Sequence, residues 1–138
     1  MPRPFTYVQQ QHDLGCGVAA IATVSGVPYT RVLRDLFPTR VYKDGRLQIA
    51  ITSGGISRAL KRYGVRSYID RPRRVPKQAA ILFFDWVAKE DGVRGYHAVI
   101  KTVAGNFLDP NWNDPCEPDF YVKRWKTSGR ETLILEVP

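Results

Sequence analysis

One stretch constrains the fold of this chain more than any other: Gln9-Gln10-Gln11-His12-Asp13-Leu14-Gly15-Cys16-Gly17-Val18-Ala19-Ala20-Ile21-Ala22. Polar residues and glycine lead to a single cysteine, and small apolar residues follow it at once. Residues 16–25 have almost no polar face, which predicts a helix that is buried on most sides and ends at Gly26 and Pro28. The Cys16 thiol then lies at the first turn, where unpaired N–H groups and the helix dipole favour a thiolate.

The rest of the chain predicts helices first and strands afterwards. Helices are expected at residues 31–37, capped by Thr30, and at 54–63, capped by Ser53. Residues 47–51 fit a strand or the wall of a groove, and residues 120–126 fit a short strand or helix. Strands are expected at 65–70, 79–87, 95–103 and 132–137, with a hairpin connection at 89–94. This segregation predicts an α+β fold, with N-terminal helices packed on a C-terminal antiparallel sheet in one domain over residues 1–138.

The composition indicates a globular protein. The chain has 138 residues, 43% of them hydrophobic and 12% aromatic, which is enough to bury a core without disulfide bonds. No apolar run is long enough to span a membrane, and residues 1–5 lack the apolar core of a signal peptide. The two cysteines, Cys16 and Cys116, do not form a disulfide framework, so we expect a reducing, cytoplasmic location.

The charge of the chain is unevenly distributed. The formal net charge is +8, and residues 1–64 hold nine Lys or Arg against three Asp or Glu. Such a surface attracts acidic partners and nucleic acid, but no nucleic-acid-binding motif accompanies it, so a basic soluble protein is the preferred interpretation. A zinc site would have to draw Cys16, His97, Cys116 and either His12 or Asp109 from separate segments. We therefore predict no metal and no other cofactor.

Two residues in the second half could serve a Cys16 nucleophile. His97 lies near the start of an apolar strand, where a general base would be held rigidly. Asp109 follows twelve residues later, after the turn at Gly105-Asn106, and two adjacent antiparallel strands would return it to His97. A carboxylate in that place can fix the imidazole tautomer and stabilise an imidazolium. The alternatives are a buried structural cysteine, a histidine bonded within a sheet and a turn aspartate.

Other residues could bind substrate or stabilise charge. Gln10 stands six residues before Cys16, and its amide could donate to an oxyanion together with the Cys16 N–H. Because Gln9 and Gln11 flank Gln10, the glutamine that donates could also be one residue earlier or later. The alternative is that all three glutamines are solvated and none of them donates to an oxyanion. Gly17 keeps the surroundings of the thiol open. Tyr96 and Trp112 are further candidates for the substrate groove, each with a structural packing role as the alternative.

Taken in order, these motifs resemble the papain-like cysteine peptidases, and most closely the family that cleaves double-glycine leaders from bacteriocin precursors, with its stand-alone relatives. In that family a glutamine precedes the cysteine by six residues, Cys-Gly opens an alanine-rich helix, a histidine begins a strand and Asp-Pro ends the next. The matching residues, within roughly residues 5–115, are Gln10, Cys16-Gly17, Ala19-Ala20, His97-Ala98-Val99 and Leu108-Asp109-Pro110.

The chain also departs from the family pattern. Gly15 stands where the family usually has aspartate, and Val18 stands where it often has proline or alanine. The spacing from His97 to Asp109 is somewhat shorter than the family's, which fits a tighter hairpin between the two strands. No transporter or ATPase segment accompanies the motifs in these 138 residues, so the resemblance is to a stand-alone peptidase domain.

The resemblance implies a cysteine peptidase-like hydrolase that acts on a peptide or protein. Cys16 would be the nucleophile, His97 the base, Asp109 the residue that orients His97, and Gln10 the oxyanion donor. The same triad would also serve a thiol acyltransferase or a deamidase. A catalytically inactive module on this fold that captures a peptide or an acidic partner is a further alternative. The sequence does not indicate an oligomeric state.

Overall fold

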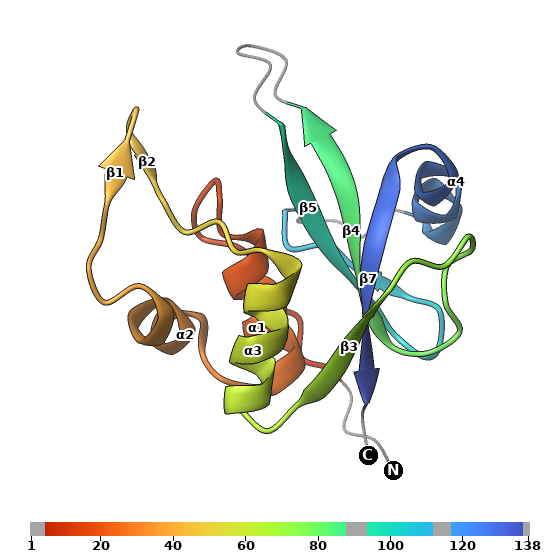
Figure 1. Cartoon of the computed structure of the whole chain (residues 1–138), viewed down its shortest axis with the longest axis horizontal. Coiled ribbons are helices and arrows are strands. Elements are labelled where there is room, and N and C mark those ends of the chain that lie inside the picture. The colour runs from red at the N-terminus through yellow and green to blue at the C-terminus, as the bar shows by residue number, and fades with distance from the viewer. Residues whose placement is uncertain (1–4, 88–93, 112–116, 137–138) are drawn as a thin grey trace.

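The structure is a computed structural model that describes residues 5–87, 94–111 and 117–136 (Figure 1). The first part contains α1 (Cys16–Ser25), α2 (Tyr29–Leu36), β1 (Tyr42–Lys43), β2 (Arg46–Leu47) and α3 (Ser53–Arg62). The second part contains β3 (Arg66–Asp70), β4 (Ala80–Val87), β5 (Arg94–Lys101), β6 (Phe107–Leu108), α4 (Pro118–Ser128) and β7 (Gly129–Glu136). The predicted α+β arrangement, with N-terminal helices and a C-terminal antiparallel sheet, is confirmed.

The main sheet has the strand order β3-β7-β4-β5-β6, and all of its neighbouring strands are antiparallel. The last strand, β7, lies between β3 and β4, so the C-terminal segment is central to the sheet. Strands β4 and β5 pair along their whole length, with Phe84 opposite His97. The short strand β6 pairs only with the end of β5, so no described strand pairs with this edge of β5 at His97.

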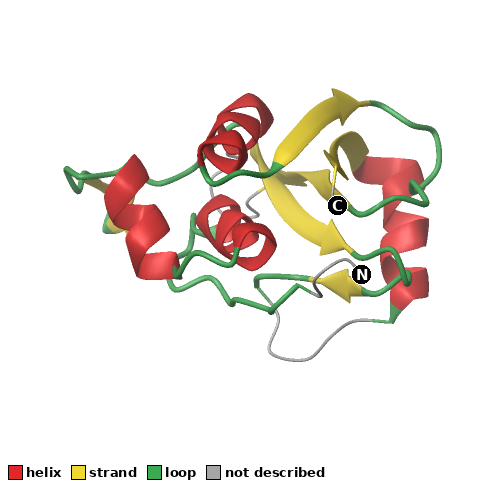
Figure 2. Cartoon of the chain, turned by 90° about the horizontal axis from the view of Figure 1, so that it is seen from below, coloured by secondary structure: helices red, strands yellow, loops and turns green. Residues whose placement is uncertain are grey.

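Helices cover both faces of this sheet. Figures 1 and 2 show α1 and α3 on one side and α4 on the other. Ile81, Phe83 and Ala98 pack toward α1, whereas Leu82 and Phe84 pack toward α4. A strand that is buried on both faces has no polar alternation, which explains the continuous apolar run of β4.

Helix α1 has the predicted bounds and the predicted burial. Every residue from Gly17 to Val24 is buried. Gly26 closes the helix with a φ of 78° and donates its N–H to the carbonyl of Ala22. That left-handed conformation suits glycine, which has no Cβ.

The predicted starts of the next two helices are wrong by one or two residues. Helix α2 begins at Tyr29, because the N–H groups of Arg31 and Val32 both bond to the carbonyl of Pro28. Thr30 therefore lies inside the helix and is not its cap. Helix α3 is capped by Thr52, whose hydroxyl accepts the Gly55 N–H at 3.0 Å, and Ser53 is its first helical residue.

Three segments that the sequence left open or placed approximately are now defined. Residues 120–126 belong to helix α4, and the last strand begins at Gly129, three residues earlier than predicted. Only Leu47 of the segment 47–51 is in a strand, and Ile51 lines a cavity. The hairpin connection was predicted at residues 89–94. Residues 89–93 lie outside the described residues, and Arg94 belongs to β5. Strand β5 begins at Arg94 and ends at Lys101, two residues before the predicted end.

Within the described ranges, no single helix has the length and apolar character needed to cross a membrane. Helices α1 and α2 reach the required length and composition only together, across a bend of 118°.

Candidate active site

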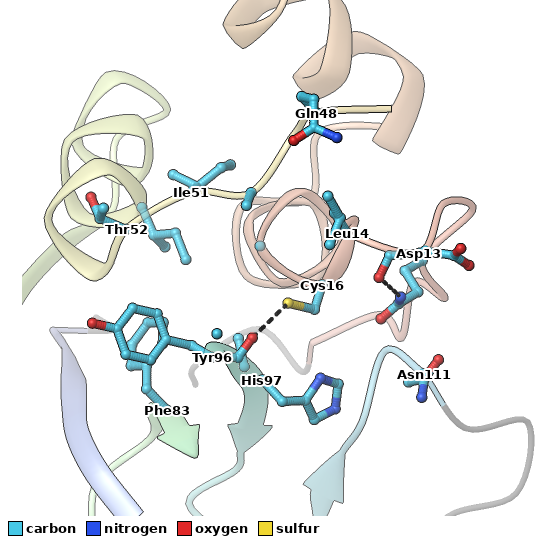
Figure 3. Close-up of a pocket in the computed structure, with 16 residues that line it drawn as sticks. Asp13, Leu14, Cys16, Gln48, Ile51, Thr52, Phe83, Tyr96, His97 and Asn111 are labelled. Carbon is cyan, nitrogen blue, oxygen red and sulfur yellow. Dashed lines mark hydrogen bonds between the residues drawn. The ribbon is translucent and has the colours of Figure 1, made fainter. Parts of the chain in front are cut away.

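The fold brings Cys16, His97 and Asp109 to one place from three separate elements. Cys16 is the first residue of α1, which packs against β5. The Cys16 thiol is half-buried and donates to the Tyr96 carbonyl, with Sγ and the oxygen 3.8 Å apart. Figure 3 shows the sulfur directed toward β5, where Tyr96 and His97 lie.

His97 and Asp109 form a short hydrogen bond. Strands β5 and β6 pair with Ile100 opposite Leu108, so the chain returns along β5 and places Asp109 directly beyond β6. The His97 Nε2 lies 2.6 Å from the Asp109 Oδ1. Because Nε2 is held by the carboxylate, Nδ1 is the ring nitrogen left to exchange a proton with the thiol.

The Asp109 carboxylate, which is only 4% exposed, has further partners. Its Oδ1 also accepts the Asn111 N–H at 3.0 Å. Its Oδ2 accepts the hydroxyl of Tyr121, on α4, at 2.9 Å. Since both oxygens are bonded, the buried carboxylate is stabilised in its ionised form.

The pKa values of the three groups are shifted in directions that favour an ion pair. Burial alone would raise the pKa of the Cys16 thiol, but a hydrogen bond and charge from His97 hold it below its usual value. Burial would lower the pKa of His97, but the bonds and charges of Asp109 and Cys16 raise it to about 9. Burial would raise the pKa of Asp109, but its bond to His97 and the charge of that ring lower it. These directions favour a thiolate–imidazolium pair over the neutral pair.

Gln10 lies in the same cavity, but its amide donors are engaged. Its Nε2 donates to the carbonyls of His12 and Asp13, at 2.9 and 3.1 Å. Those two bonds use both amide hydrogens, so the predicted bond to an oxyanion would require one of them to be exchanged. The Gln10 Oε1 is buried and has no hydrogen-bond partner within the described part of the chain.

The backbone N–H of Cys16 is a second donor at this position. Gly15 precedes the helix as its N-cap residue, so the Cys16 N–H belongs to the first turn and has no acceptor within the helix. Because this N–H belongs to the nucleophilic residue itself, it is a suitable donor to an oxyanion formed at the carbon that the thiolate attacks.

Two bonds tie the N-terminal segment to the turn that carries Asp109. The Gln10 N–H donates to the Pro110 carbonyl at 2.9 Å. The Tyr7 hydroxyl donates to the Asp109 carbonyl at 2.6 Å. The segment before the nucleophile is thus fixed against the segment that holds the acid, although 100 residues of sequence separate them.

A cavity of about 440 Å³ opens beside the thiol and contains Cys16 and His97 in its lining. Its other lining residues are mainly apolar and include Leu14, Ala50, Ile51, Ile56, Phe83 and Ala98. Figure 3 shows Ile51 and Thr52 to one side of the thiol and Asn111 to the other, so the lining residues lie on both sides of the nucleophile. Such a site can hold an extended chain across the nucleophile.

The structure places two of the three predicted substrate-binding residues. Gly17 lines the cavity, and a Cβ at this position would lie 3.4 Å from the side chains of Ile51 and Ile56. Tyr96 also lines it, but its ring already packs edge-on against Phe83 and lies 4.5 Å below the Arg130 guanidinium. Trp112 lies outside the described residues.

Besides Tyr7, sequence reasoning missed two further tyrosines that contact this site. Tyr121 bonds to Asp109, and Tyr29 bonds through its hydroxyl to His12 Nδ1 at 2.9 Å, in the loop before the nucleophile. The four-residue spacing of Tyr121 and Trp125, which places both rings on one face of the helix, was a usable signal for burial. No sequence signal pointed to Asp109 or to His12 as their partners.

The described residues hold no group of three or more His, Cys, Asp or Glu side chains placed to bind a metal ion. Cys116, one of the ligands considered from the sequence, lies outside them.

No family model and no curated protein matches the sequence. The structure does match a solved one: the crystal structure of a double-glycine motif protease from an AMS/PCAT transporter, in complex with the leader peptide. The match has a TM-score of 0.56 and 20% sequence identity, and it covers 99% of this chain and 94% of that one. The chain has the fold of this protease.

The predicted papain-like peptidase fold is therefore confirmed. At 20% identity the match concerns the fold and not the substrate or the activity. It nevertheless extends over nearly the whole chain, so it includes the C-terminal segments beyond residue 115, which the sequence motifs did not reach.

Proposed function

We propose that this protein is a cysteine peptidase-like hydrolase that cleaves a peptide or amide bond. The observation that carries the proposal is the 2.6 Å bond between His97 and the buried Asp109, with the His97 ring coupled to a thiol at the start of α1. A structural histidine or a structural cysteine alone would not require this three-residue arrangement. The apolar cavity beside the thiol offers room for a chain.

In the proposed reaction His97 Nδ1 holds the proton of Cys16, and the thiolate attacks the carbonyl carbon of the substrate. The carbonyl electron pair moves to oxygen, and the Cys16 N–H donates to the resulting oxyanion. The Gln10 amide also donates to the oxyanion once it releases the carbonyl of His12 or Asp13. His97 then gives its proton to the leaving amine, the C–N bond breaks and an acyl thioester remains on Cys16.

Water completes the reaction in a hydrolase. His97 takes a proton from water, and the resulting hydroxide attacks the thioester carbon. The C–S bond then breaks, the acid product leaves, and Cys16 returns to the thiolate form beside protonated His97. If an amine or a thiol replaces water, the same thioester yields an acyl transfer. If the substrate is a side-chain amide, the product is a deamidated residue.

The substrate class that we propose is a peptide or protein segment. The solved protease of the same fold was crystallised with a leader peptide. In this chain the cavity walls include apolar side chains such as Ile51, Ile56 and Phe83, which favour apolar residues near the cleaved bond.

The test is to incubate the protein with a defined peptide library that includes Gly-Gly sequences, and to identify the products by mass spectrometry. We expect cleavage that Cys16→Ala abolishes while the thermal unfolding temperature is retained. Reactions in ¹⁸O-labelled water, with and without a competing amine, separate hydrolysis from acyl transfer. Cleavage that persists in Cys16→Ala would reject the mechanism.

A binding module without catalysis is the second candidate. The observation that favours it is that both donors of Gln10 are already bonded within the loop, which leaves one identified oxyanion donor. If the library yields no product, peptides retained by the protein should be identified instead. Binding that weakens steeply with added salt would then indicate capture of acidic segments by the basic surface.

A further inference from the structure

We propose that Tyr121 is a positioning residue that holds the Asp109 carboxylate in the orientation that His97 requires. The C-terminal helix α4 would then be part of the active site and not only a cover for the sheet. The inference rests on the proposed function, because a positioned acid matters only if His97 serves the Cys16 thiol.

The contact itself is direct and buried. The Tyr121 hydroxyl donates to Asp109 Oδ2 at 2.9 Å, while His97 Nε2 bonds to Oδ1 at 2.6 Å. Tyr121 is 2% exposed and Asp109 4% exposed, so the bond between these two residues is buried. The two oxygens of one carboxylate are thus held from opposite sides by a histidine and a tyrosine.

The position of the Tyr121 hydroxyl is determined by the packing of its ring. The ring stacks on Phe107, with centroids 4.8 Å apart and planes inclined by 14°, and a second ring, Phe84, lies 6.3 Å away. Phe107 is in β6, two residues before Asp109. One aromatic stack therefore fixes both the strand that leads to the acid and the donor that holds it.

Loss of the hydroxyl should weaken the His97–Asp109 pair. Oδ2 would be left as a buried acceptor without this donor, and such a carboxylate gains by rotating or by taking up a proton. Either change removes negative charge from the side of His97. The pKa of Asp109 should then rise, and that of His97 should fall from about 9 toward its ordinary value.

The direction of the His97 shift separates positioning from simple charge tuning. If Tyr121 only drew electron density from a fixed carboxylate, its removal would make Asp109 a stronger acceptor and would raise the pKa of His97. If Tyr121 positions the carboxylate, its removal lowers that pKa. A purely structural role for the hydroxyl would lower the unfolding temperature and leave the pKa of His97 where it was.

The experiment is a titration of His97 by NMR in the full chain, with Tyr121→Phe as the variant and Tyr68→Phe as the matched control. Tyr68 is an exposed tyrosine on β3, so it loses the same hydroxyl far from the acid. We expect Tyr121→Phe to lower the pKa of His97 by about one unit or more and Tyr68→Phe to leave it unchanged. An unchanged or raised value in Tyr121→Phe overturns the proposal.

A double-mutant cycle with Asp109→Asn separates the effect that Tyr121 exerts through Asp109 from a general loss of stability. If Tyr121 acts through Asp109, adding Tyr121→Phe to Asp109→Asn should produce no further shift of His97, whereas an indirect structural effect would add. Incorporation of 4-aminophenylalanine at position 121 restores a donor on the same ring and should restore the pKa. Failure of that rescue in a folded protein also counts against the proposal.

The titration also distinguishes failure of this inference from failure of the proposed function. It requires neither a substrate nor turnover, so a protein that cleaves nothing can still show the predicted shift. Conversely, active enzyme with an unchanged His97 in Tyr121→Phe would retain the proposed function and reject the role of Tyr121.

Discussion

The hydroxyl of Tyr29 occupies the space that a side chain on residue 15 would need. A Cβ placed on Gly15 would overlap the Tyr29 oxygen, which is held in the loop by its contact with His12 Nδ1. Tyr29 is 4% exposed, so its ring has little freedom to move aside. A residue with a side chain at position 15 would therefore require Tyr29 to move.

We predict that Gly15→Ala destabilises the protein by about 1–3 kcal/mol, because the new methyl group collides with the Tyr29 hydroxyl. Gly15 has a φ of −91°, so alanine is not strained by the backbone itself. Urea unfolding measures the loss. The double variant Gly15→Ala/Tyr29→Phe should recover most of it, and purely additive losses would contradict the steric explanation.

We predict that Cys16 reacts with iodoacetamide at pH 6 far faster than an ordinary thiol, because His97 stabilises its thiolate. In a Cys116→Ser background, His97→Ala should lower that rate by about 100-fold, since an ordinary thiol is largely protonated at this pH. The measurement is the alkylation rate from pH 4 to 10. A rate that follows an ordinary thiol pKa, with and without His97, would indicate an inactive site.

We predict that kcat/KM for a peptide substrate falls as the pH rises through about 9. The leaving amine needs the proton of His97, and the pKa of that ring is raised to about 9 by Asp109 and Cys16. Asp109→Asn removes the negative charge that stabilises the imidazolium, so the fall should move to lower pH. Initial rates across a pH series check the prediction, and an unmoved alkaline limit would exclude Asp109 as the cause.

We predict that the His97–Asp109 pair stabilises the fold most strongly between about pH 4 and 6.5. The pKa of His97 is raised, so its contribution is complete below the ordinary value of 6.5 and is lost as the pH rises through about 9. The pKa of Asp109 is lowered, so its contribution is present above the ordinary 3.8 and is lost as the pH falls.

The difference in unfolding free energy between the wild type and Asp109→Asn should follow this window. It should reach about 1.5–3 kcal/mol inside it, the usual contribution of a charged hydrogen bond, and decrease on both sides. Urea titrations at pH 3, 5.5, 7.5 and 9.5 would measure it. A difference that is constant across this range would mean that the pair does not carry its charge.

We predict that Gly17→Ala impairs cleavage without affecting the thiol. The added methyl group fits at 3.4 Å from Ile51 and Ile56 but occupies part of the cavity. We expect kcat/KM for peptides to fall about tenfold while the alkylation rate stays within twofold, a loss of about 1.4 kcal/mol in transition-state stabilisation. Gly54→Ala, on the first turn of α3, is the matched control. Equal effects of the two substitutions would place the substrate elsewhere.

Local sequence pattern determined a large part of this fold. Helix α1 could be located because a helix of small apolar residues without a polar face is stable only when it is buried, and because Gly26 marks its end. The proximity of His97 and Asp109 followed from the turn at Gly105-Asn106, since two paired strands return the chain over a fixed distance. These features depend on residues that are close in sequence or on a single strand pairing.

Only the tertiary structure decided how the candidate site is supported. The insertion of β7 between β3 and β4 brings α4 onto the sheet, and only then does Tyr121 reach Asp109. The loop conformation, and not the residue type, directs both donors of Gln10 to nearby carbonyls. Hydrogen bonds require donor and acceptor to meet within about 3 Å, and no periodicity in a sequence reports which distant side chains packing will bring so close.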